Sequence, residues 1–212
     1  MNIMLLGAPG CGKGTLAEKL INKKGFTQLS TGDLMRKEIS KKSVLGIQCI
    51  EYINAGKLVP DEVTNGIVKE FLKEKHNGLI FDGYPRTLNQ AKALEEILKE
   101  LGSSISKIIY IDVAKEVLLS RISGRLICPT CKISYHTINR KPKIEWICDK
   151  DQTELIRRVD DEPNKVEVRL KAYAKQTAPL IKYFSTNSGF LKIVDSGTLT
   201  PEETYQKVME TF

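Results

Sequence analysis

Short apolar runs recur along the chain at intervals that leave room for helices between them. Runs such as residues 3–6 and 108–111 are typical of strands buried on both faces, because a half-exposed strand alternates apolar and polar residues. These runs, together with a shorter mixed stretch, predict strands at residues 2–6, 25–29, 78–82, 108–113 and 190–195. Strands separated by helices predict an α/β fold, with a parallel sheet of about five strands covered by helices.

Helical periodicity fills most of the intervals between these strands. It predicts helices at residues 16–21, 34–76, 87–101, 117–124 and from 163 onward, the second interrupted near residues 56–61. Pro179 should bend or end the helix that begins at Pro163, because proline lacks a backbone N–H and crowds the preceding turn. Thr200 and Pro201 are typical of the start of a last helix. Residues 125–162 differ from the rest because they contain few apolar runs.

A glycine-rich loop lies between the first strand and the first helix, with the sequence Gly7-Ala8-Pro9-Gly10-Cys11-Gly12-Lys13-Gly14-Thr15. Glycines let backbone N–H groups wrap a phosphate at the positive end of a helix, and a lysine adds a mobile positive charge. Strand, loop and helix in this order predict a phosphate-binding loop. The general motif has a hydroxyl residue directly after the lysine, whereas here Gly14 precedes Thr15. The alternative is a glycine-rich turn that binds nothing.

Three cysteines and an aspartate lie at paired spacing within residues 125–162. Cys128 and Cys131 are separated by two residues, as are Cys148 and Asp151. Two such turns that face each other form a tetrahedral zinc site, and four protein ligands make the metal structural. The spacing favours Asp151 as the fourth ligand, with Asp149 and His136 as alternatives. Unpaired buried cysteines are the competing interpretation, and we expect Cys11 and Cys49 to be ordinary packing or loop residues.

Composition narrows the class of protein further. The chain has 212 residues, enough for one main domain with appended lobes, and a net charge of +7. Most of its 33 basic residues are lysines scattered along the chain, which is typical of a solvated surface. Without a long apolar segment or a leader, and with five cysteines, we expect a cytoplasmic protein. The eight arginines are candidates for phosphate binding, since the guanidinium group matches phosphate oxygens bidentately.

The motifs together resemble the adenylate kinase family, in its bacterial type with a long zinc-bearing lid. The resemblance runs through nearly the whole chain in the family's order, in residues 7–15, 30–36, 56–61, 81–87, 121–125, 158–161 and 177–180. The Gly14-Thr15 variant of the loop is the family's own. One departure is Asn164-Lys165, where many relatives have a Glu-Thr pair at the hinge of the lid.

The resemblance implies a P-loop nucleoside monophosphate kinase fold that catalyses Mg-ATP + AMP = 2 ADP. It implies a core of residues 1–29, 60–124 and 163–212, an AMP-binding lobe of residues 30–59 and a zinc-binding lid of residues 125–162, called the lid segment below. ATP would be bound by Gly10, Cys11, Gly12, Lys13, Gly14, Thr15, Arg121, Arg125, Ser134, Tyr135 and Leu199. AMP would be bound by Thr31, Arg36, Lys57, Leu58, Val59, Gly83, Tyr84, Pro85, Arg86, Gln90, Arg158 and Arg169.

By the same resemblance, five cations are catalytic: Lys13, Arg86, Arg125, Arg158 and Arg169. Their convergence agrees with the chemistry, because phosphoryl transfer depends on positioning and on neutralising charge. Asp33 and Asp82 would hold magnesium through its waters, while Arg140 and Arg157 are expected in surface ion pairs.

Two alternatives use the same residues. Another nucleoside monophosphate kinase, for UMP, CMP or GMP, would share the fold and chemistry. A zinc-containing nucleic-acid-binding module would use the cysteines and the net charge, but it leaves the phosphate-binding loop unexplained and lacks a basic stripe with interleaved aromatic residues. We therefore expect nucleotides as the partners, no nucleic acid or membrane, and a monomer.

Overall fold

The computed structural model describes residues 1–186, 189–195 and 198–212. In this part of the chain, five parallel strands form one sheet in the order β2-β3-β1-β4-β7. The strands are β1 (Asn2–Leu6), β2 (Thr27–Ser30), β3 (Leu79–Asp82), β4 (Lys107–Val113) and β7 (Phe190–Asp195). The predicted parallel sheet is thus confirmed. In its centre, Met4 of β1 pairs with Phe81 of β3 and with Ile108 of β4.

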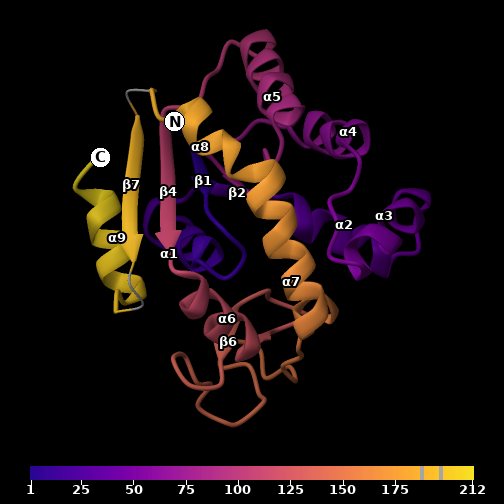
Figure 1. Cartoon of the computed structure of the whole chain (residues 1–212), viewed down its shortest axis with the longest axis vertical. Helices are drawn as coiled ribbons and strands as arrows, with labels where there is room; N and C mark the ends of the chain where they lie inside the picture. Colours follow the sequence, from indigo (N-terminus) through magenta and orange to yellow (C-terminus); the bar gives the residue numbers. More distant parts are fainter. Residues whose placement is uncertain (187–188, 196–197) are drawn as a thin grey trace.

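Helices cover both faces of this sheet (Figure 1). They are α1 (Lys13–Lys24), α2 (Thr31–Ser40), α3 (Val44–Asn54), α4 (Asp61–Phe71), α5 (Leu88–Glu100), α6 (Lys115–Ser123), α7 (Pro163–Ala172), α8 (Pro179–Phe184) and α9 (Pro201–Met209). Met4 and Phe81 pack with residues of α4, α5 and α8, whereas Ile3 and Ile80 pack with residues of α1, α6 and α9. Because both faces are covered, the central strand β1 is buried and apolar at every position from Ile3 to Leu6.

Two segments extend beyond the sheet. Figure 1 shows α2 and α3 at one side, and the lid segment beyond the end toward which the arrow of β4 points. The lid segment contains the antiparallel pair β5 (Arg125–Ile127) and β6 (Ser134–His136), and it ends in a 3₁₀ turn at Val159–Asp161. No helix in the described residues is long and apolar enough to cross a membrane.

The helical stretch between β2 and β3 contains a break that the periodicity does not predict. The helix expected near Leu34 already begins at Thr31, because the Ser30 side chain caps it by accepting from the Asp33 N–H at 3.3 Å. Lys42 then adopts a left-handed φ of 53°, and Ser43 caps α3 by accepting from the Gly46 N–H at 3.0 Å. A Cβ on Gly46 would lie 2.3 Å from the Glu38 carbonyl oxygen, so only glycine lets α3 pack this closely on α2.

Pro179 interrupts the long C-terminal helix as predicted, but the change in geometry begins earlier. Helix α7 ends at Ala172, and a π-helical turn occupies Tyr173–Thr177. The Ala178 N–H donates to the Tyr173 carbonyl at 2.8 Å across this widened turn, and Pro179 is the first residue of α8. The wider turn provides room for a proline ring that would otherwise press on the preceding turn.

Candidate active site

The glycine-rich loop connects the central strand β1 to helix α1, in the middle of the sheet edge. Gly12, with a φ of 101°, directly precedes α1, and a Cβ on Gly10 would lie 2.7 Å from an Ile122 side-chain carbon. The Lys13 ammonium donates to the carbonyls of Gly7 at 2.7 Å and Ala8 at 3.1 Å. The loop therefore presents free N–H groups at a helix N-terminus beside an ammonium group, which is the arrangement that binds phosphate.

A cleft of about 790 Å³ runs from this loop between the two extended segments. Its walls contain nearly all the residues expected to bind nucleotides. The expected residues that line it are Gly10, Cys11, Gly12, Lys13, Gly14, Thr15, Thr31, Asp33, Arg36, Lys57, Leu58, Val59, Asp82, Gly83, Pro85, Arg86, Gln90, Arg121, Arg125, Ser134, Tyr135, Arg158, Arg169 and Leu199. Residues from both segments and from the sheet edge thus meet around one space.

Tyr84 is the one expected nucleotide-binding residue that does not line the cleft. Its side chain is buried in the core, where the hydroxyl donates to the Asn65 side chain at 2.7 Å and to the Gln90 carbonyl at 3.2 Å. Burial, followed by the nearby Asp61 carboxylate, raises the pKa of Tyr84 far above its usual value. Tyr84 therefore supports the wall of the cleft from behind.

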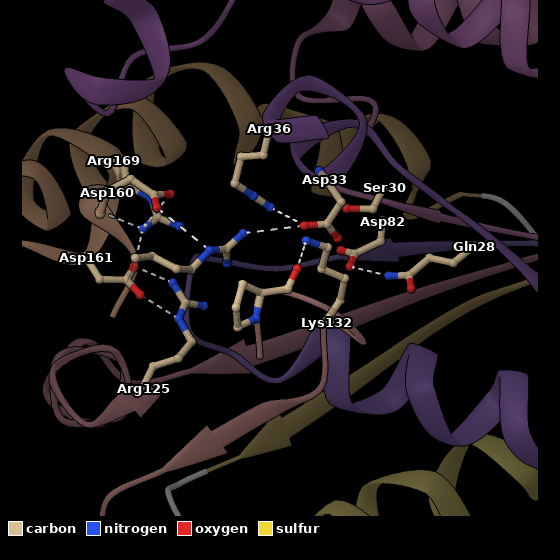
Figure 2. A network of polar contacts seen from close by, with 12 residues as sticks. Gln28, Ser30, Asp33, Arg36, Asp82, Arg125, Lys132, Asp160, Asp161 and Arg169 are labelled. Carbon is tan, nitrogen blue, oxygen red and sulfur yellow. Dashed lines mark hydrogen bonds and ion pairs between the residues drawn. The ribbon is translucent and has the colours of Figure 1, made fainter. Parts of the chain in front are cut away.

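Aspartates hold three arginines of the cleft, Arg36, Arg125 and Arg169 (Figure 2). Asp161 accepts from Arg125 Nε at 2.7 Å and from Arg169 Nη1 at 2.6 Å, so one carboxylate orients two guanidinium groups. Asp33 accepts from Arg36 at 2.5 Å and lies 3.8 Å from Arg158. Positive side chains from the lid segment, α2 and α7 are thereby gathered at one place, although like charges repel.

Burial and the crowding of like charges lower the pKa values of two partly buried arginines. Burial, then the charges of Arg36 and Arg125, lowers the pKa of Arg158 to about 9. Burial, then the charge of Arg169, lowers the pKa of Arg86 to about 10. Within the described residues, Arg158 Nε is the buried side-chain atom without a hydrogen-bond partner. An anion between these arginines would satisfy both the charge and the free donor.

Gln90 is fixed in the wall of the cleft next to β3 and α2. Its amide oxygen accepts from the Arg86 N–H at 2.7 Å, and its amide nitrogen donates to Asp61 at 2.7 Å. Thr31, which is also buried, donates to the Gly83 carbonyl at 3.1 Å. One N–H and one lone pair of the Gln90 amide remain free of these contacts, so the side chain can present both a donor and an acceptor to a base.

Another part of the cleft lies at the end of β7. Arg121 donates to the buried Asp195 carboxylate at 2.8 Å, and the Leu199 N–H donates to the same carboxylate at 3.3 Å. Asp195 is the last residue of β7, so the strand fixes the carboxylate and the carboxylate fixes the Arg121 guanidinium. A planar guanidinium group held in this way can stack on a flat ring.

The cysteine cluster lies in the lid segment, and its four expected ligands converge. One ligand atom from each of Cys128, Cys131, Cys148 and Asp151 lies within 4.8 Å of all the others. Cys131 Sγ and Cys148 Sγ are 3.5 Å apart, and Cys128 Sγ lies 3.3 Å from Asp151. Tetrahedral zinc with bonds of about 2.0–2.3 Å separates its ligands by roughly 3.3–3.8 Å, so this set fits the metal.

Comparisons with known proteins agree with this geometry. The model of the family described as adenylate kinase matches residues 5–189. An adenylate kinase from Mesoplasma florum is 66% identical over 209 residues, covering 99% of each chain. Others, from Mycoplasma mycoides subsp. mycoides SC and Bacillus subtilis, are 55% and 46% identical and cover 98% and 92% of this chain and 97% and 90% of their own.

The chain belongs to the adenylate kinase family. Membership makes it a phosphotransferase and confirms the P-loop nucleoside monophosphate kinase fold. Membership excludes the zinc-containing nucleic-acid-binding module, because such a module would not match an adenylate kinase along its full length. The cleft is thus the candidate active site, and the lid segment carries the cysteine cluster that the resemblance places there.

Several residues that shape this adenylate kinase cleft were not assigned a role from the sequence. They are Glu18, Asp61, Asp160, Asp161 and Asp195. Asp160 and Asp161 adjoin Arg158, a signal that could have been used, while the others are far in sequence from the residues they hold. Of the two arginines expected in surface ion pairs, Arg140 forms a bidentate pair with Glu18 at 2.8 Å, whereas Arg157 lies 5.9 Å from the centre of the Trp146 ring.

Proposed function

We propose a division of the cleft for the reversible transfer of a phosphoryl group from Mg-ATP to AMP, the reaction that family membership gives to this chain. The glycine-rich loop would hold the ATP phosphates, with Arg121 and the Leu199 backbone against its adenine and Arg125, Ser134 and Tyr135 above it. AMP would lie in the part of the cleft that contains Thr31, Arg36, Lys57, Leu58, Val59, Gly83, Pro85, Arg86 and Gln90.

The observation that carries this proposal is the position of the cations. Lys13, Arg36, Arg86, Arg125, Arg158 and Arg169 all line one continuous cleft, between the fixed Gln90 amide and the Arg121 wall. In the transfer, an AMP phosphate oxygen attacks the γ-phosphorus, and the bond from that phosphorus to the β-bridging oxygen breaks. The attacking oxygen is already anionic, so no general base is needed. Positioned cations that neutralise the phosphate oxygens provide most of the rate acceleration.

The lid segment would exclude water during the transfer. Water is smaller than AMP and competes with it as the acceptor, so an open cleft would hydrolyse ATP. Ser134 and Tyr135 line the cleft from β6, and Arg125 and Arg158 lie at the two ends of the lid segment. We therefore assign residues 125–162 and 30–59 as the two lobes that close over the core formed by residues 1–29, 60–124 and 163–212.

Two metals fit this scheme. Magnesium, which neutralises phosphate charge and orients the phosphates, would be held through its waters by Asp33 and Asp82. The Asp82 carboxylate accepts from the Gln28 amide at 2.9 Å and lines the cleft. Zinc would be held by Cys128, Cys131, Cys148 and Asp151, supported by the Cys131 N–H on Cys128 Sγ and the Lys150 N–H on Cys148 Sγ, both at 3.4 Å. Four protein ligands leave no open position, so the zinc is structural.

We also propose that the enzyme is monomeric and cytoplasmic. The residues assigned to ATP and to AMP all line the cleft of this chain, which supports the proposal of a monomer. None of the five cysteines forms a disulfide, which suits the reducing cytoplasm.

The experiment that tests the proposed function offers AMP, UMP, CMP and GMP separately with Mg-ATP and measures diphosphate formation. We expect turnover with AMP to be at least about a hundredfold above that with the others, and to be lost in Lys13→Ala. The reason is that hydrogen bonds hold the Gln90 amide and Thr31 in place where adenine is proposed to bind. Preference for another monophosphate would overturn the assignment of Thr31 and Gln90. No turnover with any of them would overturn the proposed division of the cleft.

A further inference from the structure

The two metal-binding turns of the lid segment are alike in their backbone. Lys132 follows the Cys128/Cys131 turn, and Gln152 follows the Cys148/Asp151 turn. The Lys132 N–H donates to the Cys128 carbonyl at 3.1 Å, and the Gln152 N–H donates to the Cys148 carbonyl at 3.0 Å. Both residues are left-handed, with φ of 65° and 60°. The turns themselves impose this conformation, which glycine or asparagine adopts at the lowest cost.

The two residues differ in what they face. Lys132 lines the cleft, and Gln152 does not. Figure 2 shows the Lys132 side chain beside Asp33 and Asp82 in this view. The Lys132 ammonium donates to the Pro129 carbonyl of its own turn. The metal-binding turn therefore positions a long cationic side chain at the cleft, in a backbone conformation that a lysine rarely adopts.

The charge of Lys132 is not neutralised by a carboxylate. Arg125 and Arg169 are paired with Asp161, and Arg140 is paired with Glu18. In the described part of the chain, no carboxylate oxygen lies within ion-pairing distance of the Lys132 ammonium. Lys13 is held in a similar way, by two main-chain carbonyls and the Cys11 Sγ, without a carboxylate. Both ammonium groups can exchange a carbonyl for a phosphate oxygen without breaking an ion pair, and the bond to phosphate is the stronger because both partners are charged.

We propose that Lys132 is a further phosphate-binding residue, which the zinc-binding turn delivers to the terminal phosphates of the donor nucleotide when the lid segment closes. This inference rests on the proposed function, in which Arg125, Ser134 and Tyr135 of the same segment cover ATP. It gives the metal site a second role, because the turn that holds Cys128 and Cys131 also fixes the starting point of the lysine side chain.

The test is Lys132→Asn, which removes the charge and keeps a residue that tolerates positive φ. The matched control is Lys141→Asn, an exposed lysine of the lid segment that does not line the cleft. For Lys132→Asn we expect the KM for ATP to rise about five- to tenfold with the KM for AMP within about twofold, the loss of one charge-assisted contact to the donor. The melting temperature of the nucleotide-free protein should stay the same or rise, since strain is relieved. Lys132→Arg should recover most of the ATP affinity.

Calorimetric titration with inorganic tripolyphosphate separates this inference from the proposed function, because it needs no turnover. Weaker tripolyphosphate binding by Lys132→Asn, with Lys141→Asn like the parent, supports the role of Lys132 even if the acceptor were not AMP. Equal binding and equal KM for ATP in the parent and Lys132→Asn would overturn it. A rise confined to the KM for AMP, or a fall in melting temperature with unchanged KM values, would also overturn it.

Discussion

Arg158 is the residue whose surroundings most oppose its charge. It is largely buried, Arg36 and Arg125 repel it, and its pKa is lowered to about 9, while the aspartates nearest to it are 3.8 Å away. At neutral pH the folded protein therefore holds a cation that it stabilises poorly. Such an arrangement is expected where a bound anion supplies the missing partner. The charge of Arg158 thus serves anion binding but lowers the stability of the nucleotide-free protein.

We expect Arg158→Met to lower kcat/KM by about a hundredfold or more, because a cation directed at the transferred phosphoryl group is lost. The melting temperature of the nucleotide-free protein should be unchanged or higher, since a poorly paired buried charge is replaced by an apolar side chain. Steady-state kinetics and thermal unfolding with and without ADP measure both effects, and the stabilisation by ADP should shrink.

The neighbouring Arg157 provides the control for this change. It is exposed beside Trp146 and does not line the cleft, so Arg157→Met should leave kinetics and ADP stabilisation near those of the parent. A marked fall in the nucleotide-free melting temperature of Arg158→Met alone would show that Arg158 is a structural ion-pair residue, contrary to this interpretation.

The chemical type of the cleft residues could be predicted from the sequence, but their supports could not. Lys13 is marked by the glycines around it, and the arginines by their motifs. Asp61 holds Gln90 across 29 positions and Asp195 holds Arg121 across 74, and no local spacing relates the members of such pairs. A motif can also predict too much. Tyr84 lies between two residues that line the cleft, but its own side chain is buried in the core.

Among the elements, the lid segment is joined to α1 by one well-formed ion pair. Both nitrogens of the Arg140 guanidinium fork donate to Glu18 of α1 at 2.8 Å, and the group lies 5.7 Å from the centre of the Tyr135 ring. The side chains are only partly exposed, at 37% and 26%. Since Glu18 belongs to the core and Arg140 to the lid segment, the pair favours the conformation in which the lid segment lies against α1.

We expect Glu18→Gln or Arg140→Gln alone to raise the KM for ATP about two- to fivefold, because a partly exposed ion pair contributes about 0.5–1 kcal/mol to the closed conformation. ATP hydrolysis without AMP should rise relative to transfer, since a lid segment that closes less often admits water. The double variant Glu18→Lys/Arg140→Glu should recover most of the parent behaviour. If the effects of changing Glu18 and Arg140 on the KM for ATP simply add in the double variant, with no recovery, a direct coupling between the two side chains is contradicted.

Element existence was more predictable than element boundaries. The strands follow from apolar runs, and α9 begins at the predicted capping sequence, with Thr200 and Glu203 forming a reciprocal capping box. The periodicity does not reveal the break at Lys41–Ser43, because Lys41 and Lys42 are themselves good helix formers. It exists because α3 must fold back on α2 to enclose Cys49, which confirms the packing role expected for that cysteine. Tertiary packing thus decides what local propensity leaves open.

For the whole molecule, the lid segment depends on a very small core of its own. The buried residues of this core cluster are Leu126, Cys128, Tyr135, Cys148 and Leu155, and two of these five are expected zinc ligands. The sheet, by contrast, has large clusters of buried residues on both faces. So small a core is not enough to keep the lid segment folded without a bound metal, whereas the sheet and its helices can fold independently of the metal.

Removal of zinc should therefore unfold the lid segment before the rest of the molecule. The purified protein should contain one zinc ion per chain, and chelation should lower the melting temperature by roughly 8–16 °C, the effect of about 4 kcal/mol lost from a tightly bound metal. Proteolysis of the chelated protein should cut within residues 125–162 and leave the sheet intact, as mass spectrometry would show. Cys148→Ser should behave like the chelated protein, whereas Cys49→Ala should lose stability and keep its zinc, because Cys49 lies in the α2–α3 core. A zinc-free protein with the parent's melting temperature and an uncut lid segment would mean that this small core folds unaided and that the thiols only pack, and Lys132 would then owe its position to the backbone alone.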